Sequence, residues 1–147
     1  MKNALQPIVN SFEYIIIDCP PSLGLLTVNA MTAATEVLVP IQCEYYALEG
    51  VSQLLTTIRL IQKNLNPGLN ILGVLFTMFD KRVNLSLQVA KEVLRYFKEK
   101  VFRTIIPRNV KLTEAPGFGK PIFLYDIRSP GAMSYLNLAN EVINRSK

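Results

Sequence analysis

The chain has 147 residues, half of them apolar, and a formal net charge of +5. That length corresponds to one domain or part of one, and the apolar content is enough for a substantial core. Histidine is absent, which excludes Ser-His-Asp and Cys-His nucleophilic chemistry as well as His-rich zinc sites. Cys19 and Cys43 are the two cysteines. They do not make a metal-ligand set, and we expect both to be buried free thiols.

The charge is unevenly distributed along the chain. Residues 1–79 hold three Lys/Arg and five Asp/Glu, whereas residues 80–147 hold thirteen Lys/Arg and six Asp/Glu. The basic excess favours an anionic partner for the second half, although solvated helix faces are also often rich in lysine. No apolar run approaches the length that spans a bilayer, and the N-terminus lacks a signal-peptide pattern, so we expect a cytoplasmic protein.

The start of the chain predicts the end of a helix followed by a buried strand. Apolar residues recur at helical spacing over residues 5–9. The β-branched run Ile-Ile-Ile at residues 15–17 is typical of a strand that is buried on both faces. This strand is expected to end at Asp18, because Pro20 and Pro21 lack the backbone N–H groups that a strand ladder needs.

Strands and helices then alternate with short connections. Further strands are predicted over residues 37–41, 71–79 and 101–106, and Pro107 ends the last of them. The helices are predicted from apolar residues at helical spacing, with Asn84 as the cap of the third: Leu25, Leu26, Val28 and Met31; Leu48, Val51, Leu54, Leu55, Ile58 and Ile61; Leu85, Val89, Val93 and Phe97; and Met133, Leu136, Ala139, Val142 and Ile143. The alternation predicts one compact α/β unit with a mostly parallel sheet covered by helices.

Asp18 is the first candidate functional residue, because it stands where an apolar strand ends and a turn begins. In open α/β sheets, ligands bind at the carboxyl ends of the strands. A carboxylate at that point is suited to hold a nucleotide-bound Mg²⁺, directly or through water. Aspartate is also a common turn cap, so position alone leaves both roles open.

The string Y-I-I-I-D-C-P-P-S-L-G at residues 14–24 resembles the Walker B segment of the ParA/Soj chromosome-partitioning ATPases. These belong to the deviant-Walker-A group that also holds the MinD-like proteins. The resemblance covers essentially the whole chain in order, and it continues through V-L-V-P-I-Q-C-E-Y-Y-A-L-E-G (37–50), T-M-F-D-K-R (77–82), I-P-R-N-V-K-L-T-E-A-P (106–116) and G-K-P-I-F-L-Y-D (119–126). It implies a P-loop NTPase-like fold.

A phosphate-binding Walker A loop, G-x-x-x-x-G-K-[ST], is not present in any register. The resemblance implies that residues 1–147 are the C-terminal part of a single ParA-type ATPase domain, starting just before Walker B. The absent P-loop strand would lie between the strands that end at Asp18 and Ile41. We therefore expect a gap in the sheet with unpaired backbone groups, poor solubility or self-association, and no ATP hydrolysis by this chain alone.

The resemblance also implies roles for individual residues in ATP and Mg²⁺ binding. Asp18 would be the catalytic Walker B residue and hold Mg²⁺ through a coordinating water. Pro20, Pro21 and Ser22 would form the switch that senses the γ-phosphate, although Ser22 could equally cap the next helix. Two strand ends would flank the adenine, or else serve as ordinary turns: Thr77 on one side and Pro107, Arg108 and Asn109 on the other.

Further residues are implied in contacts with macromolecules. Candidates for non-specific contact with DNA phosphates are Arg82, Arg103, Arg108, Lys111 and Lys120. Glu44, Tyr45 and Glu49 fall where family members approach the second subunit of an ATP-sandwich dimer, although exposed polar residues there are also unremarkable. No helix-turn-helix, zinc-finger or basic-zipper pattern is present, so sequence-specific DNA readout is not expected.

The preferred hypothesis is a nucleoid-associated, ATP-dependent partition switch of a chromosome or plasmid. ATP and Mg²⁺ would close a homodimer that binds DNA, and a ParB-type partner would stimulate hydrolysis. One alternative is a non-catalytic remnant that keeps only a DNA-binding or dimer-contact surface. A MinD-like membrane-positioning ATPase ranks lower, because residues 141–147 resemble a plain core-facing helix rather than a basic membrane-targeting one.

Overall fold

The computed structural model describes residues 1–146, so the last residue of the predicted C-terminal segment, Lys147, lies outside it. The chain forms two units, one made of residues 1–37 and 49–71 and the other of residues 38–48 and those from 72 onward. None of the described helices combines the length and the apolar character needed to cross a lipid bilayer.

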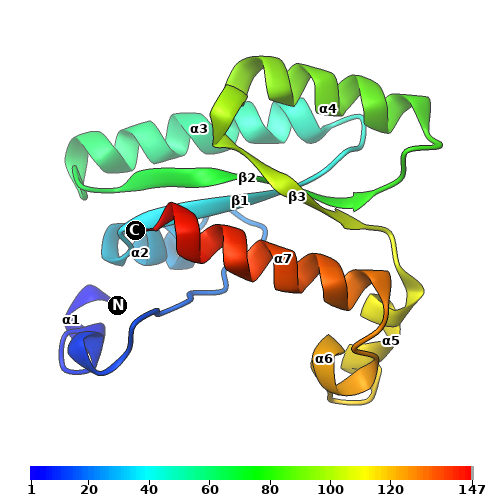
Figure 1. Cartoon of the computed structure of the whole chain (residues 1–147). Coiled ribbons are helices and arrows are strands. Elements are labelled where there is room, and N and C mark those ends of the chain that lie inside the picture. The colour runs from blue at the N-terminus through cyan, green and yellow to red at the C-terminus, as the bar shows by residue number, and fades with distance from the viewer. Residues whose placement is uncertain (147) are drawn as a thin grey trace. The chain divides into compact units, whose positions relative to one another are not determined.

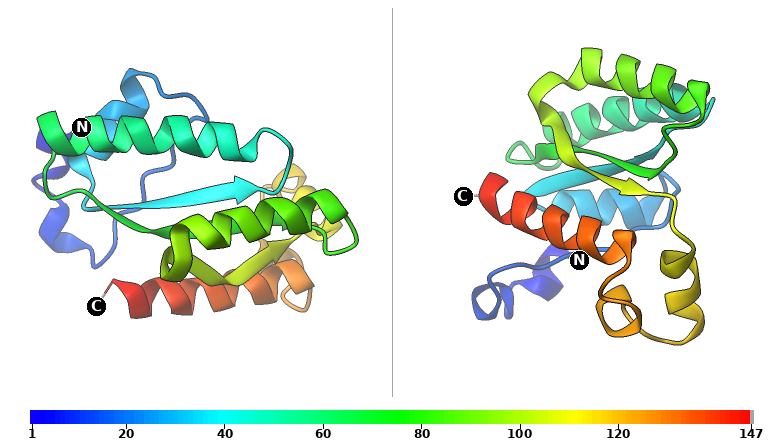
Figure 2. Two further views of the ribbon diagram at one scale, coloured as in Figure 1. Left: turned by 90° about the horizontal axis from the view of Figure 1, so that it is seen from above. Right: turned by 45° about the vertical axis from the view of Figure 1, so that its right-hand side comes forward.

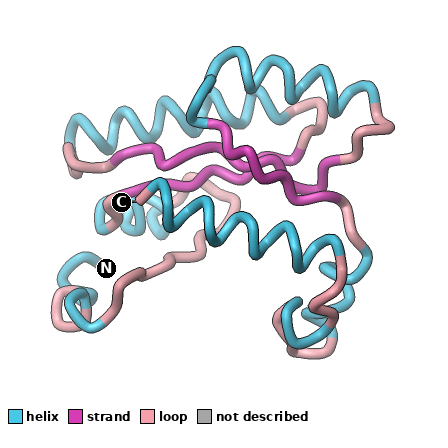
Figure 3. Tube along the Cα trace, in the orientation of Figure 1, coloured by secondary structure: helices cyan, strands magenta, loops and turns pink. Residues whose placement is uncertain are grey.

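The first unit opens on two single turns, α1 (Lys2–Leu5) and the 3₁₀ turn η1 (Val9–Ser11), and then on an irregular segment. The strand predicted over residues 15–17 is wrong, because this segment is a loop (Figure 3). Ile16 is 93% exposed. A strand needs a neighbour for its N–H and C=O groups, and none of the described strands pairs with this segment. A strong β-propensity therefore does not produce a strand here.

The core of the first unit lies between α2 (Leu25–Ala33) and α3 (Ala47–Asn64). Met31, Ile58, Ile61 and Leu69 are buried together there. Ile58 and Ile61 lie on the face that the helical spacing of α3 predicts. Asn66 ties the connection to α2, because its side-chain amide donates to the carbonyls of Met31 (3.0 Å) and Ala34 (2.7 Å). The predicted inner face of α2 is only half right, since Leu25 and Leu26 are 81% and 66% exposed.

The second unit carries the sheet, whose strands β1 (Glu36–Gln42), β2 (Asn70–Phe79) and β3 (Val101–Pro107) lie in the order β1-β2-β3. These strands confirm the three predicted after residue 36. β2 pairs with β3 in parallel, from Val74 opposite Val101 to Phe79 opposite Pro107. The sheet is thus mostly parallel and covered by helices, in agreement with the predicted fold class.

Helices cover both faces of the β2–β3 pair, with α4 (Asn84–Phe97) on one side and α7 (Pro130–Arg145) on the other (Figure 1, Figure 2). α4 buries Val89 and Val93 as predicted. Asn84 is its first residue rather than its cap, since Val83 occupies the cap position without a side-chain hydrogen bond. The 3₁₀ turn η2 (Lys98–Lys100) leads into β3, and two helices absent from the sequence prediction, α5 (Val110–Gly117) and α6 (Ile122–Tyr125), follow it.

α7 packs on the sheet with a face that overlaps the predicted one only at Val142. Its buried residues include Ala132 and Leu138, and Val142 packs against the same core. The predicted face is largely exposed: Met133 is 50% and Leu136 is 47% exposed. The helical spacing of apolar residues fits either face, and contact with β3 decides between them.

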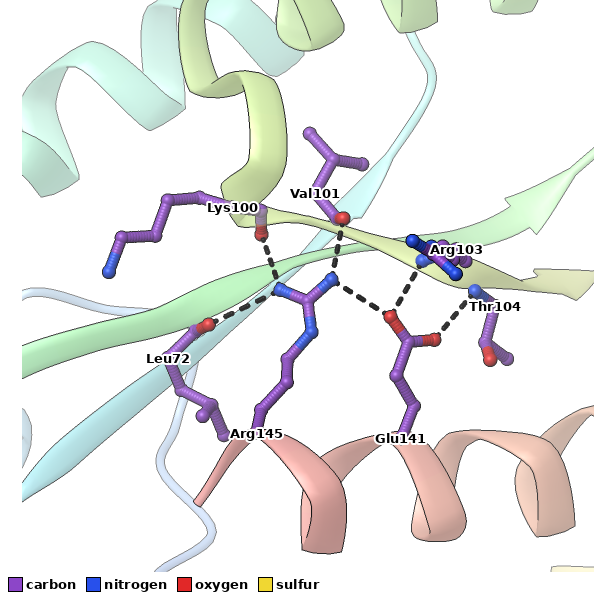
Figure 4. Close-up of polar contacts among 7 residues, drawn as sticks. All are labelled: Leu72, Lys100, Val101, Arg103, Thr104, Glu141 and Arg145. Carbon is purple, nitrogen blue, oxygen red and sulfur yellow. Dashed lines mark hydrogen bonds and ion pairs between the residues drawn. The ribbon is translucent and has the colours of Figure 1, made fainter. Parts of the chain in front are cut away.

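The C-terminal end of α7 is fastened to β3 by Glu141 and Arg145 (Figure 4). The Arg145 guanidinium donates to the carbonyls of Leu72, Lys100 and Val101 and to the Glu141 carboxylate. Glu141 also accepts hydrogen bonds from the backbone N–H groups of Arg103 (2.8 Å) and Thr104 (2.9 Å).

These interactions keep Glu141 ionised and occupy backbone groups that the strand ladder leaves unpaired. Burial acts to raise the pKa of Glu141, but the N–H donors of Arg103 and Thr104 and the Arg145 guanidinium hold that pKa below its usual value. β3 is irregular here, since the partner of Val74 is Val101 whereas that of Phe76 is Ile105. The carboxylate therefore pairs with N–H groups within this irregular stretch of β3.

Gly73 allows β2 to approach this assembly closely. A Cβ at this position would lie 2.6 Å from the carbonyl oxygen of Lys100, 2.7 Å from the Phe102 ring and 2.9 Å from Arg145 Nη1. The Lys100 carbonyl stands directly before β3 and cannot move away without disturbing the pairing of the two strands. Glycine is thus required here for packing.

We predict that Gly73→Ala lowers the free energy of unfolding by about 2 kcal/mol or more, because the added methyl group overpacks the β2–β3 contact. The measurement is urea denaturation of the purified chain. Gly50→Ala is the matched control, since nothing lies within 4 Å of a Cβ there. Alanine within α3 should stabilise the chain by about 0.5–1 kcal/mol. Equal effects of the two substitutions would contradict the packing role of Gly73.

Candidate functional site

The loops that follow β1, β2 and β3 lie at one edge of the sheet in the second unit. Parallel strands place their carboxyl ends on the same side, which is where open α/β sheets bind ligands. The ends of β2 and β3 are joined directly, because the Arg108 backbone N–H donates to the Phe79 carbonyl at 3.2 Å. This edge lies at the end of β2 and β3 nearest α5 (Figure 1).

A first hollow of about 230 Å³ opens at this edge. All three strand-end loops and the start of α4 contribute to it, and it is lined by Gln42, Cys43, Glu44, Met78, Asp80, Val83, Leu85, Ser86 and Arg108. The Ser86 hydroxyl donates to the Cys43 carbonyl at 3.2 Å and so ties α4 to the end of β1. Burial raises the pKa of the Cys43 thiol to about 11, so this cysteine is protonated at neutral pH and is a poor nucleophile.

The two cysteines differ in their surroundings. Cys43 is a buried free thiol, as expected, whereas Cys19 is exposed. The expectation for Cys19 is wrong because it depended on a strand that does not form in residues 12–18.

Met78 has a strained backbone at the end of β2, with φ of +50°. Residues with a side chain rarely adopt this left-handed region, and such outliers gather where the surrounding structure fixes a functional loop. Met78 is 41% exposed and lines the first hollow. No residue-type signal in the sequence marks this position, because glycine or asparagine would be expected at a positive φ.

A second hollow of about 270 Å³ lies beside the ends of β2 and β3. It is lined by Phe79, Asp80, Lys81, Arg82, Pro107 and Arg108, so three basic side chains surround one carboxylate. Asp80 and Arg82 form a two-point ion pair, with Nε to Oδ1 at 2.9 Å and Nη2 to Oδ2 at 2.7 Å. The Arg82 guanidinium holds the pKa of Asp80 well below its usual range through these hydrogen bonds.

Among the residues predicted to flank a base, Arg108 and Pro107 reach the hollows. Arg108 lines both and Pro107 lines the second. Thr77 is half-buried within β2, which continues to Phe79 rather than ending at Thr77. Asn109 caps the start of α5, because its side-chain oxygen accepts from the Lys111 backbone N–H at 3.1 Å; the alternative kept open for it was an ordinary turn.

The predicted magnesium and switch residues, Asp18, Pro20, Pro21 and Ser22, all lie in the first unit and are exposed. None of the ion pairs within residues 1–146 includes Asp18. Gly24, not Ser22, is the cap residue of α2. The Ser22 carbonyl instead accepts a hydrogen bond from the Thr27 hydroxyl at 2.6 Å.

The basic residues predicted to contact DNA differ in their local partners. Lys111 Nζ lies 3.0 Å from a carboxylate oxygen of Glu114, which also accepts from the Tyr125 hydroxyl at 2.8 Å. Arg103 and Lys120 are exposed. The predicted dimer residues are exposed as well: Glu44, Tyr45 and Glu49.

The chain matches one family model and is similar to curated chromosome-partitioning proteins. A family model described as "AAA domain" matches residues 1–71. The sporulation initiation inhibitor protein Soj of Bacillus subtilis is 63% identical over 97% of this chain and 56% of its own length. The chromosome partitioning protein ParA of Myxococcus xanthus is 59% identical over 99% of this chain and 51% of its own length. The chain thus spans about half the length of the curated relatives it matches.

Solved structures support the fold. Cobyrinic acid a,c-diamide synthase from Mycobacterium smegmatis, solved with bound ATP analog and magnesium, matches with a TM-score of 0.79 and 37% identity over 99% of this chain and 52% of its own. The cell division ATPase MinD of Pyrococcus furiosus, at 24% identity and a TM-score of 0.78, supports the fold alone.

The curated relatives match nearly all of this chain, and the solved structures share its fold. The chain belongs to the ParA/Soj family of chromosome-partitioning ATPases.

Proposed function

We propose that this chain is part of a ParA/Soj-type ATPase that acts in chromosome or plasmid partitioning. The chain would be the C-terminal part of a single ATPase domain and would not hydrolyse ATP alone, since no Walker A motif occurs in it. The observation that carries the proposal is the strand-end edge, where Arg108 lines two adjoining hollows beside a strained Met78.

The first hollow fits the base end of a nucleotide. It combines apolar walls from Val83 and Leu85 with the hydrogen-bonding groups of Gln42 and Glu44 and the charge of Arg108. Small-ligand sites typically join apolar surface to a few polar groups in this way. ATP would be held here with its phosphates directed to a loop that this chain lacks.

Asp18 fits the role of a magnesium-binding carboxylate in the assembled site. It is exposed, and none of the ion pairs among the described residues includes it, so its oxygens are available to a hydrated cation. Mg²⁺ usually keeps several waters and is held through one or two carboxylates and substrate phosphates. When bound, the ion would neutralise charge on the phosphate oxygens.

We predict that Asp18→Asn in the complete protein lowers ATP hydrolysis roughly 100-fold, because the metal position loses its carboxylate. The measurement is phosphate release under saturating ATP and Mg²⁺. Glu13→Gln is the matched control: it removes an exposed carboxylate from the same irregular segment and should leave the rate unchanged. Equal rates for the two variants would refute the role of Asp18. A complete protein that neither binds nor hydrolyses nucleotide would favour the alternative of a non-catalytic remnant.

The basic edge of the second unit is suited to non-specific contact with DNA by the ATP-bound dimer. Lys81, Arg82 and Arg108 gather at one hollow, and contacts to DNA phosphates need positive charge without base readout. The dimer would form through Glu44, Tyr45 and Glu49, associate with the nucleoid, and be released when a ParB-type partner stimulates hydrolysis.

We predict that Arg82→Gln weakens the binding of two unrelated DNA duplexes equally and reduces the slope of log affinity against log salt by about 1, because one phosphate contact is lost. The measurement is fluorescence anisotropy of the complete protein with ATP over a salt titration. Arg95→Gln serves as the control. Arg95 is exposed and lies about 16 Å along α4 from Asn84, the first residue of that helix. An unchanged affinity and slope for Arg82→Gln would show that Arg82 does not contact DNA.

A further inference from the structure

Asp80 is the one acidic residue among the three cations of the second hollow, and the proposed function gives it no role. A carboxylate at a phosphate-binding surface would be expected to repel the ligand. Yet Asp80 is directed at Arg82, the cation proposed to contact DNA, through both of its carboxylate oxygens. Asp80 is therefore placed to affect the Arg82 guanidinium directly.

The ion pair uses only part of the hydrogen-bonding capacity of Arg82. A guanidinium carries five N–H donors in a planar fork. Asp80 accepts one from Nε and one from Nη2, and the Arg82 backbone N–H donates to the same Oδ1 at 3.0 Å. The Arg82 side chain remains 83% exposed. The two N–H groups of Nη1 and the second N–H of Nη2 are thus left for a ligand.

Asp80 is itself held in place. Its side chain is only 19% exposed, and its carbonyl accepts from the Val83 backbone N–H at 3.1 Å, which closes the turn between β2 and α4. The guanidinium is consequently paired with a carboxylate that belongs to a hydrogen-bonded turn. A fixed fork loses less rotational freedom when it binds a phosphate than a free arginine does.

We propose that Asp80 is a positioning residue, which orients the Arg82 fork so that its outer N–H groups, with Lys81 and Arg108, take one phosphate of the DNA backbone. This inference rests on the proposed DNA contact by Arg82 and assigns its geometry. The ligand chemistry is a phosphodiester, because several N–H donors converge and no base-reading pattern is present among them.

Charge and orientation predict opposite effects when Asp80 is neutralised. Asp80→Asn makes the protein more positive by one charge, so simple electrostatics predicts tighter binding to DNA. If Asp80 orients Arg82, the same substitution weakens binding to DNA, since the two-point ion pair that holds the guanidinium is lost. The sign of the change therefore separates the two explanations.

The test uses the complete protein with ATP and the same anisotropy assay. Asp80→Asn is expected to weaken DNA binding roughly threefold, in the range of an exposed ion pair. Glu92→Gln is the matched control, because it removes an exposed carboxylate of α4 and adds the same charge. It should leave affinity unchanged or raise it slightly. Thermal melting of each variant checks that the fold is retained.

A double-mutant cycle shows whether Asp80 acts through Arg82. In the Arg82→Gln background, Asp80→Asn should no longer weaken binding and should instead tighten it slightly, because only the charge effect remains. Arg82→Lys gives a second readout if Asp80→Asn does not fold. Arg82→Lys keeps the positive charge but removes the planar guanidinium, so it should weaken DNA binding about as much as Asp80→Asn does.

Tighter binding by Asp80→Asn, together with weaker binding by Arg82→Gln, would overturn the orienting role and leave the DNA contact intact. So would an unchanged affinity for Arg82→Lys, or equal effects of Asp80→Asn in both backgrounds. If Arg82→Gln itself has no effect, the DNA contact and the role of Asp80 fail together.

Discussion

The parallel pairing of β2 with β3 is the constraint on which the second unit depends. Two devices fix it: Gly73 lets the strands approach where any Cβ would collide with the Lys100 carbonyl, and Glu141 with Arg145 fastens α7 to the backbone of both strands. Arg145 also lies over the Phe102 ring, 4.1 Å from its centroid, which adds a cation–π contact to the hydrogen bonds. The close packing at Gly73 and the hydrogen bonds of Glu141 and Arg145 thus set the alignment of the two strands.

This alignment determines where functional groups can gather. Because β2 and β3 run in the same direction, their last residues meet at one edge, and the hydrogen bond from Arg108 to Phe79 joins them there. The two hollows share Asp80 and Arg108, so the proposed nucleotide pocket and the proposed phosphate-binding surface are adjoining parts of one edge. A change at Asp80 or Arg108 can therefore affect both, whereas Arg82 lines only the second hollow.

Much of the second unit could be predicted from sequence, since buried parallel strands read as continuous apolar runs. β1, β2 and β3 were predicted for that reason. The isoleucines at residues 15–17 carry the same signal, but a strand also needs a neighbour, which propensity does not supply. The packed face of α7 depends on contact with β3 rather than on spacing. α5 escaped prediction because Pro116 and the glycines near it read as turn residues.

The sequence predicted candidate residues for the strand-end edge but not their geometry. Pro107 and Arg108 lie at the end of β3 and directly after it, as predicted, and their functional roles stay predictions. The two-point ion pair between Asp80 and Arg82 and the positive φ of Met78 depend on the path of the turn, which sequence spacing does not define.

We propose that this strand-end edge receives the base end of a nucleotide. The most direct test is an NMR titration of the isotope-labelled complete protein with ADP and Mg²⁺. We expect the backbone amide signals to shift together, with one saturation curve, at Met78, Asp80, Arg108 and Asn109. Amide shifts that leave these residues unchanged while nucleotide binds elsewhere would contradict it.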